Sequence, residues 1–453
     1  MLKSQLKRYW IPIALLGMFL LSFFLRWQYI KNTEIIKPIR ADAYQYVVIA
    51  SNLATHGKFT SANPPLHSTQ EARPPGYCFF LASIFKVTDN FQEFYRTTLW
   101  IQSLLGSLTV LMTYFIARFL LAPGWSILAA LLMMISPHMI VMSAYFLSES
   151  LYVFLQTLAI LLLLYAIRRD SLLLLATGAV TLGTAIFVRP VLGVFPFIAA
   201  GLIFHLLRKS KPRNSIIIMC ALTLLLSLAP QTAWVIWKTS NLSKDTQPVS
   251  ALKVALLSGV YPNLTYKRPE LKGMPYRDDP EWNRIFESGY FGIAGSVLTR
   301  FRQEPFENAR WWIVGKPVMF WSWKVFFSDG INFYPVKRTW FDTNKFMSLI
   351  RGSMITFHFV FVIFALIGSI LFWRRTYMKA NIQGKFCYLL LLGLAGHFTL
   401  IFMVLAPFPR YSLPLALALY ILFTLALKEM WELYSLRGKP ALISPNSTNR
   451  KEA

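Results

Sequence analysis

Long apolar runs, separated by short polar connections, make up most of the chain. A helix needs roughly 20 predominantly apolar residues to cross a bilayer. Runs that approach this length cover 9–29, 97–120, 125–143, 147–167, 171–188, 191–207, 214–237, 353–373, 386–406 and 411–428. The apolar segments 76–87 and 311–327 are too short or too interrupted to cross alone, so they predict re-entrant or interfacial helices. The pattern predicts an all-α polytopic membrane protein with about 10 to 12 transmembrane helices.

The composition agrees with this class. Of the 453 residues, 55% are hydrophobic and 15% are charged, whereas soluble domains carry about 25% charged residues. These values exclude an ordinary soluble enzyme, a disordered chain and a fibrous repeat. Cys78, Cys220 and Cys387 lie in or beside apolar runs without paired spacing, which is typical of buried thiols rather than of a disulfide framework.

The charges of the short connections predict the orientation, because Lys and Arg accumulate on the cytoplasmic side of short loops. Basic clusters flank the first run and occupy 208–213, 374–385 and the C-terminal tail, whereas the short connections on the opposite side contain only Arg189 and Arg410. This asymmetry predicts that both termini are cytoplasmic. It also accounts for most of the formal net charge of +26, so the charge does not indicate a nucleic-acid partner.

Two long segments fall on the outer side, and the chemistry of the protein is expected there. They are residues 31–96 and 238–351. The predicted organisation is an N-terminal transmembrane module (1–237) with a catalytic first outer loop (31–96), an extracytoplasmic loop domain (238–352), C-terminal transmembrane helices (353–430) and a flexible cytoplasmic tail (431–453).

The first outer loop places an acid at the start of a short amphipathic helix. Asp42 is followed by Tyr46, Ile49, Ala50 and Leu53, which share one helical face. A helix of this kind lies along a membrane surface. Asp42 is a candidate catalytic carboxylate in that position, and its alternative role is that of a helix N-cap.

Two further charged residues occur at the outer ends of apolar runs. Arg73 precedes a Pro-Pro corner that fixes the backbone direction. Glu149 opens the run 147–167, and an ionisable group within an apolar run is a functional candidate. The alternatives are a snorkelling interfacial role for Arg73 and an N-terminal helix acid favoured by the macrodipole for Glu149.

Arg189 and Arg410 are each the sole charge of a short outer turn. A guanidinium fork suits a phosphate group at a membrane surface, and the alternative is an anchor for a helix end among lipid headgroups. The sequence contains no Gly-rich phosphate loop, Walker lysine motif or dinucleotide fingerprint. A soluble nucleotide-type donor therefore has no visible binding loop, and no cofactor is predicted.

This arrangement resembles the GT-C glycosyltransferases, especially the polyprenyl-phosphate-sugar-dependent family that includes protein mannosyltransferases and lipid A aminoarabinose transferases. The features that carry the resemblance are one span followed by an outer loop with Asp42, the Arg-Pro-Pro corner at Arg73, Glu149 at the opening of the fourth span, and the late pair Arg410-Tyr411. The resemblance covers about residues 1–210 and the region of Arg410. Residues 238–351 have no counterpart in it.

The resemblance implies a GT-C-like helical bundle that moves a sugar from a polyprenyl-phosphate donor to a hydroxyl acceptor of unknown identity. It implies inversion by direct displacement, in the plasma membrane of a bacterium, at the outer face. Asp42 then corresponds to the catalytic acid and acts as general base. Glu149 is the second acid, in a supporting role.

Arg73 stands where the family places a basic residue that contacts the lipid phosphate, and Arg410 and Arg189 are further guanidinium groups in short turns of the same face. Arg73, then Arg410, then Arg189 are expected to bind the donor phosphate. Tyr44, Tyr77 and Tyr411 are expected to line the substrate pocket. Many relatives have two adjacent acids where this chain reads Asp42-Ala43-Tyr44, so a metal site is not predicted and cationic side chains are expected to hold the phosphate.

Two rival functions remain open from the sequence. A transporter or lipid flippase predicts inverted repeats and ionisable residues at the bilayer midplane, whereas the acids here lie at one face. A ligase that uses a lipid pyrophosphate-linked glycan is the nearest enzymatic alternative.

Overall fold

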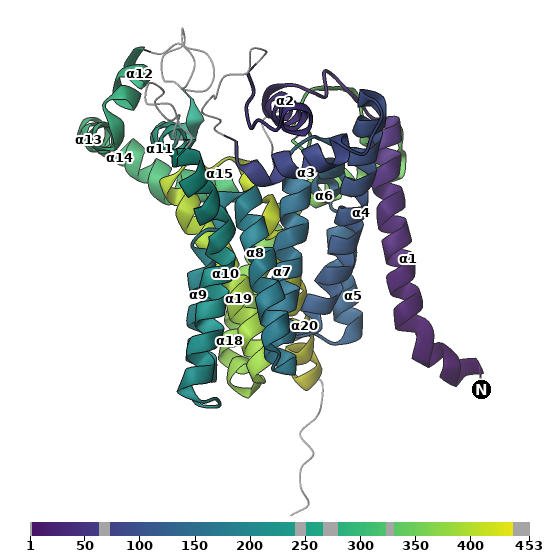
Figure 1. Cartoon of the computed structure of the whole chain (residues 1–453). Helices are drawn as coiled ribbons and strands as arrows, with labels where there is room; N and C mark the ends of the chain where they lie inside the picture. The colour runs from purple at the N-terminus through teal and green to yellow at the C-terminus, as the bar shows by residue number, and fades with distance from the viewer. Residues whose placement is uncertain (1, 63–72, 241–250, 266–279, 323–329, 438–453) are drawn as a thin grey trace, which may run out of the picture.

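The computed structural model describes residues 2–62, 73–240, 251–265, 280–322 and 330–437. Within these ranges the protein consists of helices and one two-stranded sheet. Figure 1 shows long helices packed side by side in a bundle, with a layer of shorter helices across one end. The all-α polytopic fold predicted from the apolar runs is confirmed.

The long helices coincide with the ten apolar runs of the sequence. They and the short turns between them are α1 (Leu2–Asn32), α4 (Phe91–Ala117), α5 (Pro123–Ile135), α6 (Pro137–Val141), η1 (Met142–Ala144), α7 (Glu149–Arg169), α8 (Leu172–Val188), η2 (Pro190–Leu192), α9 (Phe195–Leu207), α10 (Arg213–Ser240), α18 (His358–Arg375), η5 (Tyr377–Lys379), α19 (Ile382–Val404), η6 (Pro409–Leu415) and α20 (Ala416–Arg437). In the described part of the chain, eight helices are long and apolar enough to cross a membrane, and α5 with α6 forms a ninth candidate. The tenth run is α8, which is apolar but has 17 residues. The protein is therefore an integral, multi-pass membrane protein.

The run 125–143 does not form one straight span, as the sequence predicted, because a proline interrupts it. α5 ends at Ile135, and α6 begins at Pro137 with its axis bent by 57°. Proline disfavours helical backbone at the residue before it, and Ser136 accordingly has ψ 119°. The bend directs the chain through η1 to the first turn of α7, where Glu149 lies.

Shorter elements form the layer at the other end from the chain's N-terminus (Figure 1). They are β1 (Glu34–Ile35), α2 (Ala41–His56), α3 (Pro75–Phe85), α11 (Ala251–Val260), η3 (Pro262–Leu264), α12 (Pro280–Glu287), α13 (Gly289–Gln303), α14 (Pro305–Arg310), η4 (Trp311–Gly315), α15 (Lys316–Trp321), β2 (Val336–Arg338), α16 (Trp340–Thr343) and α17 (Lys345–Thr356). The apolar segment 76–87 lies in and just beyond α3, a short helix as expected. Of the segment 311–327, the part up to 322 is described, and it contains η4 and α15.

The described residues of the segment 238–352, predicted as one extracytoplasmic domain, pack into different cores. Residues 251–265 and 280–315, here called the arm, have a small core of their own that contains Leu257, Val260, Tyr261, Trp282, Ile285 and Ile293. Residues 330–341 pack instead into the main core of the bundle, through side chains such as Ile331 and Phe333. Their strand β2 pairs antiparallel with β1 of the first outer loop. The two long outer segments are therefore joined to each other.

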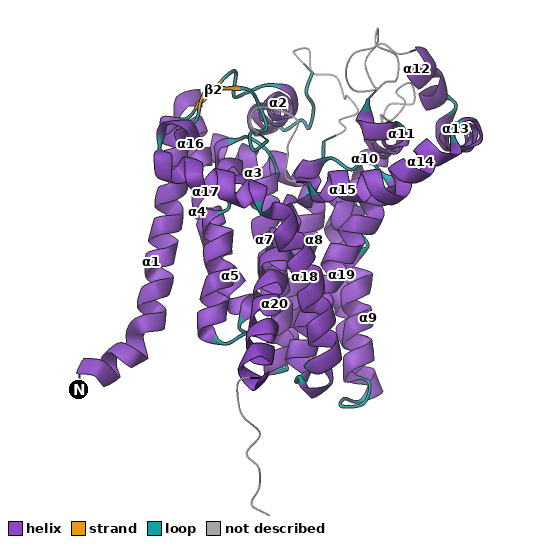
Figure 2. Ribbon diagram, turned by 180° about the vertical axis from the view of Figure 1, so that it is seen from behind, coloured by secondary structure: helices purple, strands orange, loops and turns teal. Residues whose placement is uncertain are grey.

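The two described ends of the chain lie at the same end of the bundle. Figure 2 shows that α1 begins at the end of the bundle where α20 finishes, which is the end away from α2, α3 and the arm. α20 continues to Arg437, past the boundary expected at residue 430. Residues 438–453 of the predicted tail lie outside the described residues. All three cysteines are free thiols, and Cys220 is half-buried whereas Cys78 and Cys387 are buried.

The predicted orientation in the membrane can be tested by cysteine labelling. Cysteines introduced at Lys211, between α9 and α10, and at Lys379, in η5, are expected to be shielded from a membrane-impermeant maleimide in intact cells. A cysteine introduced at Glu287, which is exposed on α12, is expected to react. The reason is the basic character of the first two connections, which places them in the cytoplasm. Reaction at 211 or 379 in intact cells would contradict the orientation.

Candidate active site

Helix α2 presents Asp42 from its first turn toward the bundle. Its buried face contains Tyr46, Ile49 and Ala50, as the periodicity predicted. The N-cap is Arg40, without a side-chain capping bond, so the alternative interpretation of Asp42 as the cap is wrong. Ala41 has φ 46°, a left-handed conformation that is unfavourable for a residue with a Cβ atom. This strained residue turns the chain immediately before Asp42.

Two guanidinium groups hold the Asp42 carboxylate. Arg73 Nη2 donates to Oδ1 at 2.6 Å, and Arg410 Nη2 donates to Oδ2 at 2.9 Å. Burial by itself raises the pKa of Asp42, but the charges of Arg410 and Arg73 outweigh burial and hold that pKa below its ordinary value. Asp42 is therefore an ionised acceptor at neutral pH. The ion pairs stabilise the fold above the ordinary Asp pKa, and this contribution is lost as the pH falls through the lowered value.

The Pro-Pro corner positions Arg73 as the sequence predicted. Pro74 is the N-cap of α3, and Pro75 is its first residue. The side chain of Arg73 also donates to Gln45 Oε1 at 2.6 Å, and its guanidinium lies 5.4 Å from the centre of the Tyr46 ring. These contacts fix the direction of Arg73 toward Asp42, beyond what an interfacial anchor requires.

The approach of α3 to α8 requires a glycine. A Cβ atom at Gly76 would lie 2.7 Å from the backbone nitrogen of Val188. Val188 is the last residue of α8, directly before Arg189. The absence of a side chain at Gly76 thus lets the corner that carries Arg73 pack beside Arg189.

Gly76→Ala is therefore expected to force α3 away from α8 and to destabilise the protein by about 1–3 kcal/mol, the usual cost of overpacking. Thermal unfolding in detergent measures this effect. Gly201→Ala on α9 is the matched control, because a Cβ atom there meets no other atom within 4 Å. Equal melting temperatures for the two variants would contradict the tight α3–α8 contact.

A second ion pair lies beside the first. Arg189 Nη1 lies 3.1 Å from Glu149 Oε1, and the carboxylate side chain is only 3% exposed. Glu149 also lies in the first turn of α7, where the helix dipole favours an acid. A carboxylate at this depth requires the paired charge, because an unpaired buried charge is strongly unfavourable.

Tyr411 joins the two ion pairs. The guanidinium groups of Arg410 and Arg189 lie 5.2 and 5.3 Å from the centre of its ring. Both arginines approach the site from short turns that interrupt the bundle, η6 and the α8–η2 connection. The structure thus brings together all five charged residues that the sequence singled out. Three guanidinium groups accompany two carboxylates, so the cluster has one more positive than negative charge and attracts an anion.

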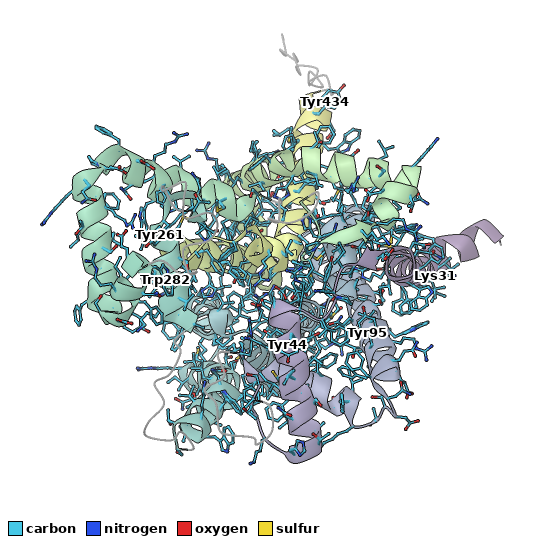
Figure 3. The ribbon with its side chains drawn as sticks, turned by 90° about the horizontal axis from the view of Figure 1, so that it is seen from above. Lys31, Tyr44, Tyr95, Tyr261, Trp282 and Tyr434 are labelled. Carbon is cyan, nitrogen blue, oxygen red and sulfur yellow. The ribbon has the colours of Figure 1, made fainter. Side chains whose placement is uncertain are left out.

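The predicted pocket tyrosines have three different positions. Tyr411 lies within the cluster. Tyr77 is fully buried and donates to Gln102 Oε1 at 2.8 Å, so it supports the site from below rather than lining it. Tyr44 is 52% exposed on the outer surface of α2, as Figure 3 shows from above, and it is not brought to the cluster. Tyr46, four residues after Asp42 on the buried face, takes the place expected of Tyr44 and packs edge-on against Tyr77.

Tyr334 is a residue of the site that the sequence did not indicate. Its hydroxyl oxygen accepts a hydrogen bond from the backbone N–H of Ala43 at 3.2 Å, and its ring packs edge-on against Tyr145. Burial, opposed by that backbone bond and assisted by the charge of Asp42, raises the pKa of Tyr334 to about 12. The phenol is therefore protonated at neutral pH, and its O–H is able to donate into the site. Tyr334 comes from the segment 238–351, in which no motif marked it.

Metal ligands do not gather in the described part of the chain, where no three His, Cys, Asp or Glu side chains come together. The two acids of the cluster are each bound to arginine instead.

Comparisons with known proteins point to one fold. Residues 72–237 match the family model described as dolichyl-phosphate-mannose-protein mannosyltransferase, a stretch that includes Arg73, Glu149 and Arg189. No curated protein sequence matches the chain. Similar solved structures include the oligosaccharyltransferase AglB from Archaeoglobus fulgidus in complex with an inhibitory peptide and a dolichol-phosphate. It is 14% identical with a TM-score of 0.51, over 95% of this chain and 51% of that chain.

A second structure of the Archaeoglobus fulgidus oligosaccharyltransferase, tethered to an acceptor peptide, has a TM-score of 0.55 at 14% identity, over 96% of this chain and 51% of that chain. ArnT from Cupriavidus metallidurans, bound to undecaprenyl phosphate, has a TM-score of 0.38 at 12% identity, over 94% of this chain and 78% of that chain. The chain thus spans about half the length of the oligosaccharyltransferases it matches. The chain has the GT-C glycosyltransferase fold, and its residues 72–237 carry the sequence pattern of the dolichyl-phosphate-mannose-protein mannosyltransferase family.

Proposed function

We propose that the protein transfers a sugar from a polyprenyl-phosphate donor to an acceptor hydroxyl at the extracytoplasmic face of a bacterial plasma membrane. One observation carries this proposal. An ionised Asp42, held by Arg73 and Arg410, lies beside a second acid–arginine pair at the end of a membrane-spanning bundle. Such a site offers a base and positive charge for a phosphate leaving group.

The arginines have hydrogen-bonding capacity for a phosphate beyond their contacts with Asp42. A guanidinium group carries five N–H donors, and Asp42 and Gln45 together accept from two nitrogens of Arg73. Arg410 donates to Asp42 through Nη2. Bidentate donation to phosphate oxygens is the geometry that arginine favours. We assign Arg73 and Arg410 as the side chains that bind the donor phosphate. Arg189 lies beside the same Tyr411 ring as Arg410 and adds positive charge near that phosphate.

The reaction is a single displacement. The acceptor oxygen attacks the anomeric carbon, and the bond from that carbon to the phosphate oxygen breaks. The bonding pair leaves with the polyprenyl phosphate, whose charge the arginines stabilise. Asp42 accepts the acceptor's hydroxyl proton. Because attack and departure occur on opposite sides of the carbon, the configuration inverts and no covalent sugar intermediate forms.

Donor binding also prepares the base. In the structure, Arg73 and Arg410 lower the pKa of Asp42, which makes it a weaker base. A phosphate that draws on the same guanidinium groups reduces this effect, so the Asp42 pKa rises once the donor is bound. Glu149 then has a supporting role, because it fixes Arg189 at 3.1 Å and keeps that charge beside Tyr411.

Mass spectrometry of the lipid that copurifies with the protein tests the function. A polyprenyl monophosphate that carries one sugar supports the proposal, especially if the purified protein transfers that sugar to an added acceptor. A pyrophosphate-linked oligosaccharide identifies the ligase instead. Binding of lipid-linked sugar with translocation across vesicles but without transfer identifies a flippase.

Tyr334→Phe is expected to lower the transfer rate about tenfold, the size of one net hydrogen bond of roughly 1.4 kcal/mol. The aromatic packing against Tyr145 is retained, so stability should change little. Tyr95→Phe on α4, a tyrosine stacked on Phe146, serves as the control and is expected to keep full activity. Equal rates for both variants in a reconstituted assay would remove Tyr334 from the proposed site.

A further inference from the structure

The arm exposes large apolar side chains to its surroundings. Phe291 is 94% exposed, Phe306 is 90% exposed and Leu298 is 61% exposed. The arm does have a core of its own, in which Ile293 and Val297 of α13 pack. The exposed residues therefore lie outside that core, and exposed apolar side chains of this size are candidates for an interaction surface.

The exposed residues follow a helical stripe. Phe291, Leu298 and Arg302 are seven and eleven residues apart along α13, a spacing that places them on one face. Ile293 and Val297 lie on a different face, which packs into the arm's core. Arg302 and Arg310 are exposed near the apolar residues, as are Glu304 and Glu307. An apolar face flanked by arginines is typical of a helix that lies in a lipid headgroup layer, where arginine extends to the phosphates.

Hydrogen bonds place the arm level with the outer end of a membrane span. The Ala406 N–H donates to the Ala255 carbonyl of α11 at 3.0 Å, and Ala406 lies just beyond the end of α19. Lys316, directly after the arm, donates from Nζ to the Met403 carbonyl of α19 at 2.9 Å. The arm is thus attached at both ends to the end of α19, a helix long and apolar enough to cross a membrane.

The arm also extends sideways rather than over the bundle. Figure 1 shows α12, α13 and α14 reaching beyond α9 and α10 at the outer end. In the view from above, Tyr261 and Trp282 of the arm lie to one side, well apart from Tyr44 on α2 (Figure 3). A structure that projects from a membrane-spanning bundle at this level lies over lipid.

We propose that the arm is a lipid-binding element, with the Phe291, Leu298 and Phe306 surface inserted among the headgroups and upper acyl chains of the outer leaflet. Two arguments favour lipid over a protein partner. The arm is hydrogen-bonded to the end of a candidate membrane span, α19, and Arg302 and Arg310 complement the phosphates of anionic lipids. This inference depends on the membrane topology and not on the proposed transfer reaction.

Spin labelling tests the depth of the arm. Nitroxide labels are attached to Phe291→Cys and Phe306→Cys, each in a Cys220→Ala background because Cys220 is the half-buried native thiol. The full-length protein is reconstituted as one copy per nanodisc of phosphatidylcholine and phosphatidylglycerol. Collision rates with oxygen, which concentrates in lipid, and with a water-soluble nickel chelate are then measured. Glu287→Cys on α12 is the control position.

Labels at 291 and 306 are expected to collide with oxygen more often, and with nickel several-fold less often, than the label at 287. Nickel access equal to that at 287 would overturn the proposal, because the arm would then stand in water. Shielding from both reagents would also overturn it, because the surface would be packed against protein. Since each altered side chain is exposed, all three variants are expected to fold.

Discussion

Asp42→Asn is expected to lower sugar transfer by about 100-fold or more, the scale of general-base loss, while the protein stays folded. Asparagine keeps the size of the side chain but does not accept the acceptor's proton at neutral pH. The ion pairs that it loses are partly buried, with 24% of the Asp42 side chain accessible, so the variant is expected to unfold at a lower temperature but to stay folded under assay conditions. The measurement is a reconstituted assay with the lipid-linked donor, together with thermal unfolding.

The donor affinity of Asp42→Asn tests the proposed role of Asp42 more sharply than the transfer rate does. Asp42 and the donor phosphate draw on the same arginines, Arg73 and Arg410. Removing the carboxylate charge therefore leaves donor binding unchanged or tighter while the catalytic rate falls. Asp170→Asn is the matched control, because Asp170 is an exposed carboxylate paired with Lys211 at the far end of the bundle. Full transfer activity in Asp42→Asn would exclude Asp42 as the base and leave Glu149 as the candidate.

Arg73→Ala is expected to weaken donor binding by roughly 10- to 150-fold, the value of a charge-assisted hydrogen bond of about 1.5–3 kcal/mol. The double variant with Arg410→Ala is expected to lose more, because both guanidinium groups serve one phosphate in the proposed site. Arg73→Lys should recover only part of the loss, since lysine lacks the bidentate fork. Equilibrium binding of the lipid-linked donor measures each effect.

The same variant has a second consequence, for the pH profile. Arg73 lowers the pKa of Asp42, so its removal raises that pKa toward the ordinary value. The acidic limb of kcat/KM, which reports the free enzyme, is then expected to move to higher pH. Arg338→Ala, at an exposed arginine on β2, controls for loss of charge on the same face. Unchanged donor affinity and an unchanged limb in Arg73→Ala would reduce Arg73 to an interfacial anchor.

Local patterns in the sequence were sufficient to predict most of the long helices and to single out the five charged residues that cluster in the structure. The Pro-Pro corner after Arg73 forms as predicted because proline restricts its own backbone and that of its predecessor. The prediction of Tyr44 as a pocket residue did not use the helical periodicity of this segment, which favours Tyr46. A helix brings residues four apart onto one face, so Tyr46, and not Tyr44, shares the inward face with Asp42.

The sequence by itself determined the membrane class and the spans, because a bilayer demands contiguous apolar residues whatever the surrounding fold. It also identified the candidate charged residues of the site, because each of them lies at the end of an apolar run or is the sole charge of a short turn. The partners of those residues were decided only by the tertiary structure. Asp42 and Arg410 are 368 positions apart, and Ala43 and Tyr334 are 291 apart. Contacts at such separation depend on how the whole bundle packs, and no periodicity or local propensity encodes them.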